Sequence, residues 1–340
     1  MKKELWVLIH LSMGFAGPER SMAVDFDRDV WNNIVDKCAE CGYNTILLDV
    51  CNGIKFKSHP EIADPDAWTA EEVTAEVHRL RELGISLFPK LNFSAAHDWW
   101  LGDYRYNRST PEYYKICKDL IAEICEIFEG PEFFHLGLDE EFPDMQNKSL
   151  YRKGDALFKD YRFLMDCVKE CGAKYMMFSS TCMHNLDLWE KYIPEDMTYT
   201  IGQYYEFEES KWTKISDQPL DVQEYYWNGG FEARRLYDEY KAKYGDTRIE
   251  YVEQEPTCFM FMDFLERAVK RGHKVFIQSS NFYIDTNDRS AVEYYHGKDY
   301  NESLPGHLAL PWVPTNKENE GRILRELENL ANAMEEFYGE

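Results

Sequence analysis

Three consecutive acids, Asp139, Glu140 and Glu141, follow a run of apolar residues near the middle of the chain. Such a run predicts a buried strand, with the acids at its carboxyl end. Neighbouring desolvated carboxylates raise one another's pKa, so one stays protonated as a general acid while another stays charged. Cleavage of a glycosidic bond requires a pair of this kind. The alternative is that Glu140 or Glu141 caps a turn and is solvated.

Polar and aromatic side chains are also predicted at the ends of the other strands. They are Asp49, Asn52, Asn92, His97, Ser180, His184, residues 203–206, residues 279–283 and Trp312. Active sites of parallel barrels are built at these ends, so we expect the side chains to converge. The predicted substrate-binding residues are Asp49, Asn92, His97, Trp100, His135, Tyr204, Tyr283 and Trp312. The candidate stacking rings are Trp99, Trp100, Tyr104, Tyr204, Tyr205 and Trp227, each of which also suits a core position.

Strand-like and helix-like runs alternate along the chain, which predicts a parallel sheet of βαβ units. The expected strands are 5–11, 45–50, 85–92, 133–139, 175–180, 198–204, 274–279 and 307–312. The expected helices include 29–41, 69–83, one opening at Thr110-Pro111, 156–171, 261–271 and 316–338. This count predicts an α/β protein with a single (β/α)8 TIM barrel over residues 1–340. Residues 206–256, with a helix at 233–244, interrupt the rhythm and are interpreted as an enlarged loop after strand six.

Composition narrows the classes of partner. Aromatic residues make up 15% of the chain, which suits either a large core or a ring-lined sugar cleft. The net charge of -24 argues against nucleic-acid binding. No apolar run is long enough to span a membrane. Nine cysteines without a metal-site spacing indicate reduced thiols in a cytoplasmic protein, with no metal and no cofactor expected. Barrels of this size often form homodimers, although no stretch marks an interface.

Residues 135–140 (HLGLDE) resemble the H-x-G-G-D-E strand of glycoside hydrolase family 20, the β-N-acetylhexosaminidases. Residues 274–285 are similar to that family's K-V-I-x-S…Y-L-D segment. Residues 88–97 are similar to its P-E-I-D-x-P-G-H stretch. The resemblance covers about residues 30–315, and only the strand-four motif is specific.

The resemblance implies a retaining, substrate-assisted glycoside hydrolase that needs no cofactor and acts on a hexosaminide or related carbohydrate. Glu140 would be the acid, and Asp139 would orient the 2-acetamido group whose carbonyl attacks the anomeric carbon. Tyr283 would donate a hydrogen bond to the acetamide, and Trp312 would form part of the wall around it.

The chain departs from the family pattern at several positions. Leu138 replaces the second glycine of the motif, and Lys90 replaces the glutamate after the strand-three proline. The strand-two H-x-T-D-D motif is DVCNG at residues 49–53, and Arg20 is only a candidate for the arginine that grips the sugar. The small β domain that precedes the barrel in the family is absent from the sequence.

Strand geometry and the resemblance favour different acids. Along an ideal strand Asp139 and Glu141 share a face and Glu140 points away, whereas a bend at the barrel rim would restore the family geometry. Two other hypotheses stay open. Asp139, Glu141 and either His97 or His184 would form a divalent metal site, or the barrel would bind sugar without cleaving it.

Overall fold

The structure is a computed structural model that describes residues 3–14, 25–141, 152–202, 256–282, 285–298 and 300–339. Its strands form a closed parallel barrel in sequence order, with β8 pairing with β1. The strands are β1 (Glu4–His10), β2 (Thr45–Asp49), β3 (Ser86–Lys90), β4 (Phe133–His135), β5 (Lys174–Phe178), β6 (Thr198–Ile201), β7 (Lys274–Ser279) and β8 (Gly306–Ala309). The predicted (β/α)8 barrel is confirmed.

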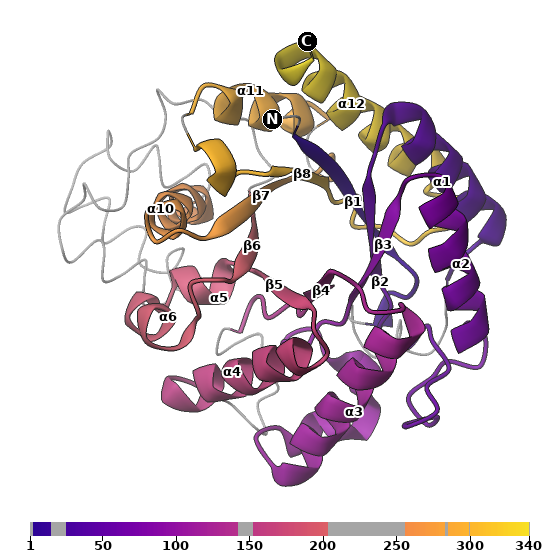
Figure 1. Cartoon of the computed structure of the whole chain (residues 1–340), viewed down its shortest axis with the longest axis vertical. Coiled ribbons are helices and arrows are strands. Elements are labelled where there is room, and N and C mark those ends of the chain that lie inside the picture. The colour runs from indigo at the N-terminus through magenta and orange to yellow at the C-terminus, as the bar shows by residue number, and fades with distance from the viewer. Residues whose placement is uncertain are drawn as a thin grey trace, which may run out of the picture.

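Helices surround the barrel, as Figure 1 shows in a view along its axis. They are α1 (Arg28–Cys41), α2 (Ala70–Glu82), α3 (Pro111–Ile127), α4 (Asp155–Glu170), α5 (Ser180–Met183), α6 (Leu186–Tyr192), α10 (Pro256–Lys270), α11 (Asn287–His296) and α12 (Glu320–Tyr338), with short 3-10 segments η2 (Trp99–Asn107) and η5 (Asn301–Ser303). Helices α11 and α12 pack side by side and close the circle against α1.

Local sequence explains where several helices begin. The Asp27 carboxylate accepts hydrogen bonds from the amides of Asp29 and Val30 at the start of α1. Thr69 and Glu72 form a reciprocal capping box at the start of α2. Such caps stabilise a helix by about 1 kcal/mol because they satisfy amides that lack an intrahelical partner.

All eight strands lie where they were predicted, but several of them end earlier than predicted. Strand four, predicted at 133–139, ends at His135, because Gly137 and Leu138 have positive φ values of 72° and 64° that no strand accommodates. Strand eight, predicted to reach Trp312, ends at Ala309. Helix α10 begins five residues before its predicted start, and α12 begins four residues after. The 206–256 excursion lies outside the described residues except for its last position.

The barrel interior consists of an apolar zone and, nearer the carboxyl ends of the strands, a polar zone. The apolar zone contains Trp6, Leu8, Leu47, Phe88, Phe133, Met176, Phe178, Phe276, Leu308 and Leu310. Two residues further along four consecutive strands, the inward side chains are His10, Asp49, Lys90 and His135, all buried. Side chains alternate in direction along a strand, so this two-residue step keeps them inside the barrel. The interior therefore becomes charged toward the rim where the site was predicted.

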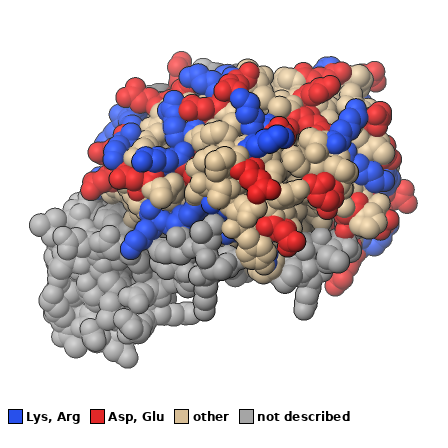
Figure 2. Space-filling model, turned by 90° about the horizontal axis from the view of Figure 1, so that it is seen from below, with Lys and Arg blue, Asp and Glu red and all other residues tan. Residues whose placement is uncertain are grey.

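The outer surface carries charges of both signs, interspersed over the face seen in Figure 2. No described helix is long and apolar enough to cross a membrane. The eight cysteines whose side chains the structure describes are free thiols. Burial raises the pKa of Cys182 to about 12, which keeps this thiol protonated and unreactive at neutral pH.

Candidate active site

The acidic loop, residues 136–141, continues from β4 in an irregular conformation. Gly137, Leu138 and Glu140 all have positive φ, which is costly for the two residues that carry a side chain. A Cβ atom added to Gly137 would lie 2.0 Å from Oδ1 of Asn92. Only glycine therefore fits this position. Strained backbone of this kind concentrates at functional sites, where the surrounding structure holds it in place.

Side chains from neighbouring elements hold the backbone of the acidic loop. The Glu140 amide donates to the Ser180 hydroxyl at 2.9 Å, and the Glu141 amide donates to Thr181 at 3.3 Å. The carbonyl of Leu138 accepts from Thr181 and from the Tyr161 hydroxyl. The loop is thereby fixed to the end of β5 and to α4. Thr181 and Tyr161 were not predicted from the sequence, since neither lies at the acidic motif.

His97 brings Asp139 and Glu140 together. Its Nε2 lies 3.1 Å from Oε2 of Glu140 and 3.4 Å from Oδ2 of Asp139. The side chains of His97 and Asp139 are 17% and 16% exposed, whereas Glu140 is 41% exposed. Burial lowers the pKa of His97, but the two carboxylates outweigh burial and raise that pKa to about 10. The histidine and the two carboxylates thus form one hydrogen-bonded, electrostatically coupled group.

Asp139 is held as a carboxylate. Asn92 donates from Nδ2 to Oδ1 of Asp139 at 2.8 Å, and Asn92 itself is fixed by the amides of Ser94 and Leu138. Burial raises the pKa of Asp139, but His97 and then Lys90 outweigh it and lower that pKa below its usual range. Asp139 therefore remains charged at neutral pH.

Glu141 points away from this group. Its Oε1 accepts from the Ala95 amide at 2.9 Å and from Arg152 at 2.9 Å, and its side chain is buried. Arg152 also binds Asp160 of α4. The expectation that Asp139 and Glu141 share a face is wrong, because strand alternation ends before the acids. The bend places Asp139 and Glu140 together instead.

Two predicted substrate-binding residues of the barrel interior lie beneath the acids. Asp49 is fully buried and binds Lys90 at 2.6 Å and His10 at 3.0 Å. Burial raises the pKa of Asp49, but the Lys90 charge and the His10 hydrogen bond lower it to about 2. His135 is also fully buried and lies 3.1 Å from the Thr200 hydroxyl. Burial, with Lys90, lowers the pKa of His135 to about 3, so it is neutral.

The predicted rings lie at different depths. Trp312 follows β8 with a φ of 50°, is partly buried, and its ring centroid lies 5.7 Å from that of His10. Trp100 is buried and donates from Nε1 to the Asn92 carbonyl at 2.8 Å, so it supports the residue that holds Asp139. Tyr204 and Tyr283 lie outside the described residues.

His97, Asp139 and Glu140 are also the described residues best arranged to hold a cation. One ligand atom from each lies within 4.8 Å of the other two. Imidazole with carboxylates suits zinc and similar divalent ions. The metal hypothesis from sequence paired Asp139 with Glu141 and His97 or His184. Because Glu141 faces Arg152, Glu140 takes its place in this set.

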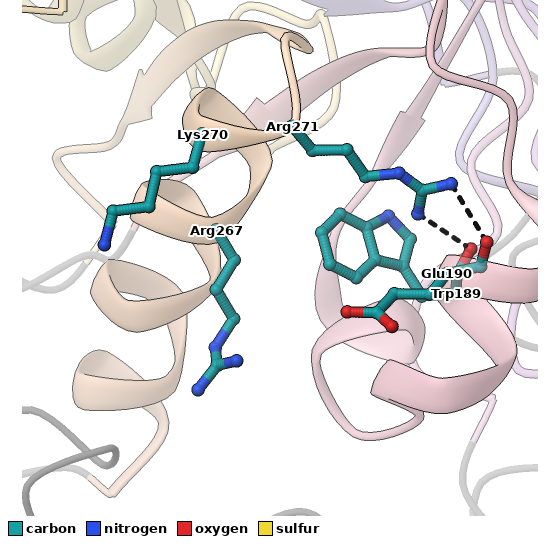
Figure 3. Close-up of a pocket in the computed structure, with 5 residues that line it drawn as sticks. All are labelled: Trp189, Glu190, Arg267, Lys270 and Arg271. Carbon is teal, nitrogen blue, oxygen red and sulfur yellow. Dashed lines mark hydrogen bonds between the residues drawn. The ribbon is translucent and has the colours of Figure 1, made fainter.

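A surface pocket of about 440 Å³ lies elsewhere, lined by Trp189, Glu190, Arg267, Lys270 and Arg271 (Figure 3). It is formed by α6 and the last turns of α10, which lead into β6 and β7, so it lies toward the end of the barrel opposite the acidic loop. Arg271 donates to the carbonyls of Trp189 and Glu190, and Arg267 binds Asp263. The arginines therefore stabilise the scaffold.

Sequence comparison gives no relative: no family model matches the chain, and no curated protein sequence matches it significantly. Solved structures do match. A β-N-acetylhexosaminidase from Bacteroides fragilis NCTC 9343 has a TM-score of 0.58 at 13% identity, over 96% of this chain and 65% of that one. A GH20 exo β-N-acetylglucosaminidase from Vibrio harveyi has a TM-score of 0.58 at 11% identity, over 99% of this chain and 57% of that one.

Dispersin B is similar in length as well, with a TM-score of 0.54 at 12% identity over 98% of this chain and 99% of that one. This chain spans less than two thirds of the Bacteroides and Vibrio proteins. The similarity is one of fold. The chain is therefore a divergent (β/α)8 barrel with the fold of the glycoside hydrolase family 20 β-N-acetylhexosaminidases, as the motif in residues 135–140 predicted.

Proposed function

We propose that this protein is a retaining glycoside hydrolase of the β-N-acetylhexosaminidase type, which cleaves a hexosaminide by substrate-assisted catalysis. The observation that carries the proposal is the His97–Asp139–Glu140 group at the end of β4. It combines a carboxylate kept charged with a more exposed carboxyl that shares a hydrogen bond with a histidine. The barrel similarity to family 20 structures supports the same assignment.

Asp139 is the orienting carboxylate in this proposal. Its lowered pKa keeps it charged, so it accepts the N–H of the substrate's 2-acetamido group. The acetamide carbonyl oxygen then attacks the anomeric carbon, and the bond from that carbon to the leaving oxygen breaks. The resulting oxazolinium ring carries a positive charge, which the nearby carboxylate stabilises. Asn92 holds Asp139 in place, which limits the reorganisation needed during the reaction.

Glu140 is the general acid. Nε2 of His97 lies 3.1 Å from Oε2 of Glu140, so a proton can pass between them along this hydrogen bond. A bound sugar excludes water, and desolvation disfavours the imidazolium–carboxylate form relative to a neutral histidine beside a protonated glutamic acid. Glu140 then gives its proton to the leaving oxygen. In the second step the Glu140 carboxylate takes a proton from water, which opens the ring with net retention at the anomeric carbon.

Glu141 is a positioning residue. It joins Arg152 to the amide of Ala95, two residues before His97. The buried ion pair thus holds the His97 loop against the acidic loop. Burial raises the pKa of Glu141 although Arg152 opposes the shift. We expect both Glu141→Ala and Glu141→Gln to lower activity through misplacement of His97. The loss should be smaller in Glu141→Gln, because glutamine has the same shape as glutamate.

A panel of nitrophenyl glycosides with and without the 2-acetamido group tests the proposal. Release from N-acetylglucosaminide or N-acetylgalactosaminide, and none from the matching sugars without the acetamide, is the expected result. Release only from sugars that lack the acetamide would overturn the substrate-assisted mechanism. Silence across the panel would overturn the hydrolase assignment for these sugars.

A metal-dependent barrel enzyme is the second candidate, because His97, Asp139 and Glu140 have the spacing of a cation site. It predicts stoichiometric metal in the purified protein and loss of activity with a chelator. Metal-free protein with full activity would exclude this candidate.

The free thiols support a cytoplasmic location, and the homodimer remains a prediction that light scattering would test.

A further inference from the structure

Four cysteines lie on the two helices that precede and follow β4. Cys117 and Cys125 belong to α3, Cys167 belongs to α4, and Cys171 is the C-cap of α4. The two helices pack against each other on the outside of the barrel (Figure 1). All four thiols are free, and the proposed catalytic group uses none of them.

Cys125 and Cys171 are in contact across this helix pair. The Cys171 side chain shares a hydrogen bond with the Cys125 thiol. Cys125 lies in the last turn of α3, and Cys171 follows the last turn of α4. Soon after each cysteine the chain turns through a glycine with positive φ, Gly130 at 72° and Gly172 at 82°. Because helix ends adjust more readily than helix interiors, the two sulfur atoms can approach the S–S distance of a disulfide, about 2.0 Å.

Access distinguishes this pair from the other two thiols. Cys171 is partly exposed, so a small oxidant in solution can reach its sulfur atom. Cys117 and Cys167 are only 0% and 4% exposed. A metal site is not the better interpretation, because among the described residues the three ligand atoms close enough to hold an ion belong to His97, Asp139 and Glu140. The arrangement therefore suits chemistry between two thiols.

We propose that Cys125 and Cys171 are an oxidation site, which closes reversibly into a disulfide that links the end of α3 to the end of α4. The oxidant would be a small disulfide such as oxidised glutathione. The Cys171 thiolate attacks one sulfur of the oxidant, which forms a mixed disulfide and releases one glutathione thiolate. The Cys125 sulfur then loses its proton, attacks the Cys171 sulfur and expels the second glutathione thiolate. Two protein thiols are oxidised, and one oxidised glutathione is reduced to two molecules of glutathione.

The surroundings of Cys125 set the pace of the second step. Burial raises the pKa of the Cys125 thiol, and the neighbouring Cys171 raises it further, which disfavours the reactive thiolate. Contact with Cys171 offsets this, because the reacting sulfur atoms need not meet by diffusion.

The disulfide would act on stability. The ends of α3 and α4 lead into β4 and β5, so the pair lies toward the end of the barrel opposite the acidic loop. The link would enclose residues 125–171, which include β4, the acidic loop and α4. Closing so long a loop restricts the unfolded chain and stabilises the folded one. The inference is independent of the proposed function, since it requires no catalysis.

Peptide mapping tests the pairing directly. The protein is equilibrated with oxidised glutathione, alkylated and digested with trypsin. Trypsin separates the thiols of Cys117, Cys125, Cys167 and Cys171 into the peptides 116–118, 119–148, 163–169 and 170–174. We expect peptide 119–148 to be disulfide-linked to peptide 170–174, and the link to disappear with dithiothreitol. A different pairing, a glutathione adduct on Cys171 without closure, or fully reduced thiols would overturn the inference.

Thermal unfolding measures what the link does. Oxidised wild type should have a Tm about 5 °C above that of its reduced form. Cys125→Ser and Cys171→Ser, each compared with its own reduced form, should lose this difference. Cys167→Ser is the matched control, because it removes a neighbouring thiol of α4 and should keep the difference. A difference that persists in Cys171→Ser, or is absent from wild type, would overturn the inference.

Discussion

Two pairs of carboxyl groups lie near the carboxyl ends of the strands, and their surroundings give them opposite properties. Asp139 and Glu140 share a histidine, and Glu140 is 41% exposed. Asp288 of α11 and Glu326 of α12 are fully buried, and the Asp288 charge contributes to the raised pKa of Glu326. Ser279 donates to Asp288 at 2.6 Å, and the Leu310 amide donates to Glu326 at 2.9 Å.

The pKa directions follow from these surroundings. His97 and Lys90 outweigh burial and lower the pKa of Asp139. Burial raises the pKa of Asp288 to about 7 and raises that of Glu326 well above its usual range. The first pair thus combines Asp139, which keeps its charge, with Glu140, whose side chain is accessible to solvent. The second is arranged to keep its protons to a higher pH than ordinary carboxyl groups do, and it ties the ends of β7 and β8 to the outer helices. Identical residue types become a candidate catalytic pair or a structural pair according to access and a neighbouring cation.

The largest expected difference between the pairs is in catalysis. Glu140→Gln should lower kcat on an N-acetylglucosaminide by about 10²- to 10⁴-fold, because an amide is too weak an acid to protonate the leaving oxygen. Its free energy of unfolding should change by less than about 1 kcal/mol, since the side chain is partly exposed. Asp288→Asn is the matched control and should retain kcat. Full activity in Glu140→Gln would show that the first pair is no more catalytic than the buried pair.

The backbone that bends the acidic loop should be the next most sensitive feature. Gly137→Ala should lower the free energy of unfolding by about 2–4 kcal/mol, through left-handed strain and a clash with Asn92. Gly172→Ala is the control, because Gly172 also has positive φ but nothing lies within 4 Å of an added Cβ. It should cost about 1–2 kcal/mol. Equal costs in denaturant unfolding would show that the fit against Asn92 is unimportant.

His97→Gln should reduce kcat by about 10- to 100-fold, because Glu140 loses its proton-sharing partner. The substitution should also change the pH dependence of stability. The pKa of His97 rises to about 10 in the folded protein, so its contribution is full below about pH 6.5 and is lost as pH rises through 10. The loss of unfolding free energy between pH 7 and pH 10.5 should be smaller in His97→Gln than in wild type. His78→Gln, at an exposed position, should behave as wild type.

The buried pair should give the smallest effect, visible in stability alone. The pKa of Asp288 is raised to about 7 in the folded state, so its contribution is full below about pH 4 and is lost as pH rises through 7. Asparagine does not titrate, so the Asp288→Asn variant does not show this pH-dependent loss of unfolding free energy. We expect the unfolding free energy of the variant relative to wild type to increase by about 2–3 kcal/mol between pH 5 and pH 8. A difference independent of pH would contradict the assignment of a buried protonated pair.

Periodicity and motif were sufficient to predict the barrel, its strand order and the location of the acids. Alternating apolar runs encode strands locally, and the acids of residues 139–141 follow one of them directly. The grouping of His97 with Asp139 and Glu140 was not predicted, because the sequence indicated His97 as a substrate-binding residue or a metal ligand. Its contacts with the two carboxylates became visible only in the structure.

The rest depends on contacts between distant residues. Leu138 and Glu140 adopt positive φ because Asn92, Ser180 and Thr181 hold the loop, and no local pattern encodes that conformation. The ion pair of Asp49 with Lys90 joins adjacent strands, so it becomes visible only once the strand register is known. The one sequence signal for it was a lysine within an otherwise apolar strand.

The most direct test of the account is whether Asp139 recognises the ring formed by the acetamide. Calorimetric titration of wild type and Asp139→Asn with a thiazoline analogue of the cyclised N-acetylglucosamine would measure this without any need for turnover. The account predicts binding to wild type that weakens at least about tenfold in Asp139→Asn. Absence of binding to wild type, or equal affinity in the two proteins, would contradict it.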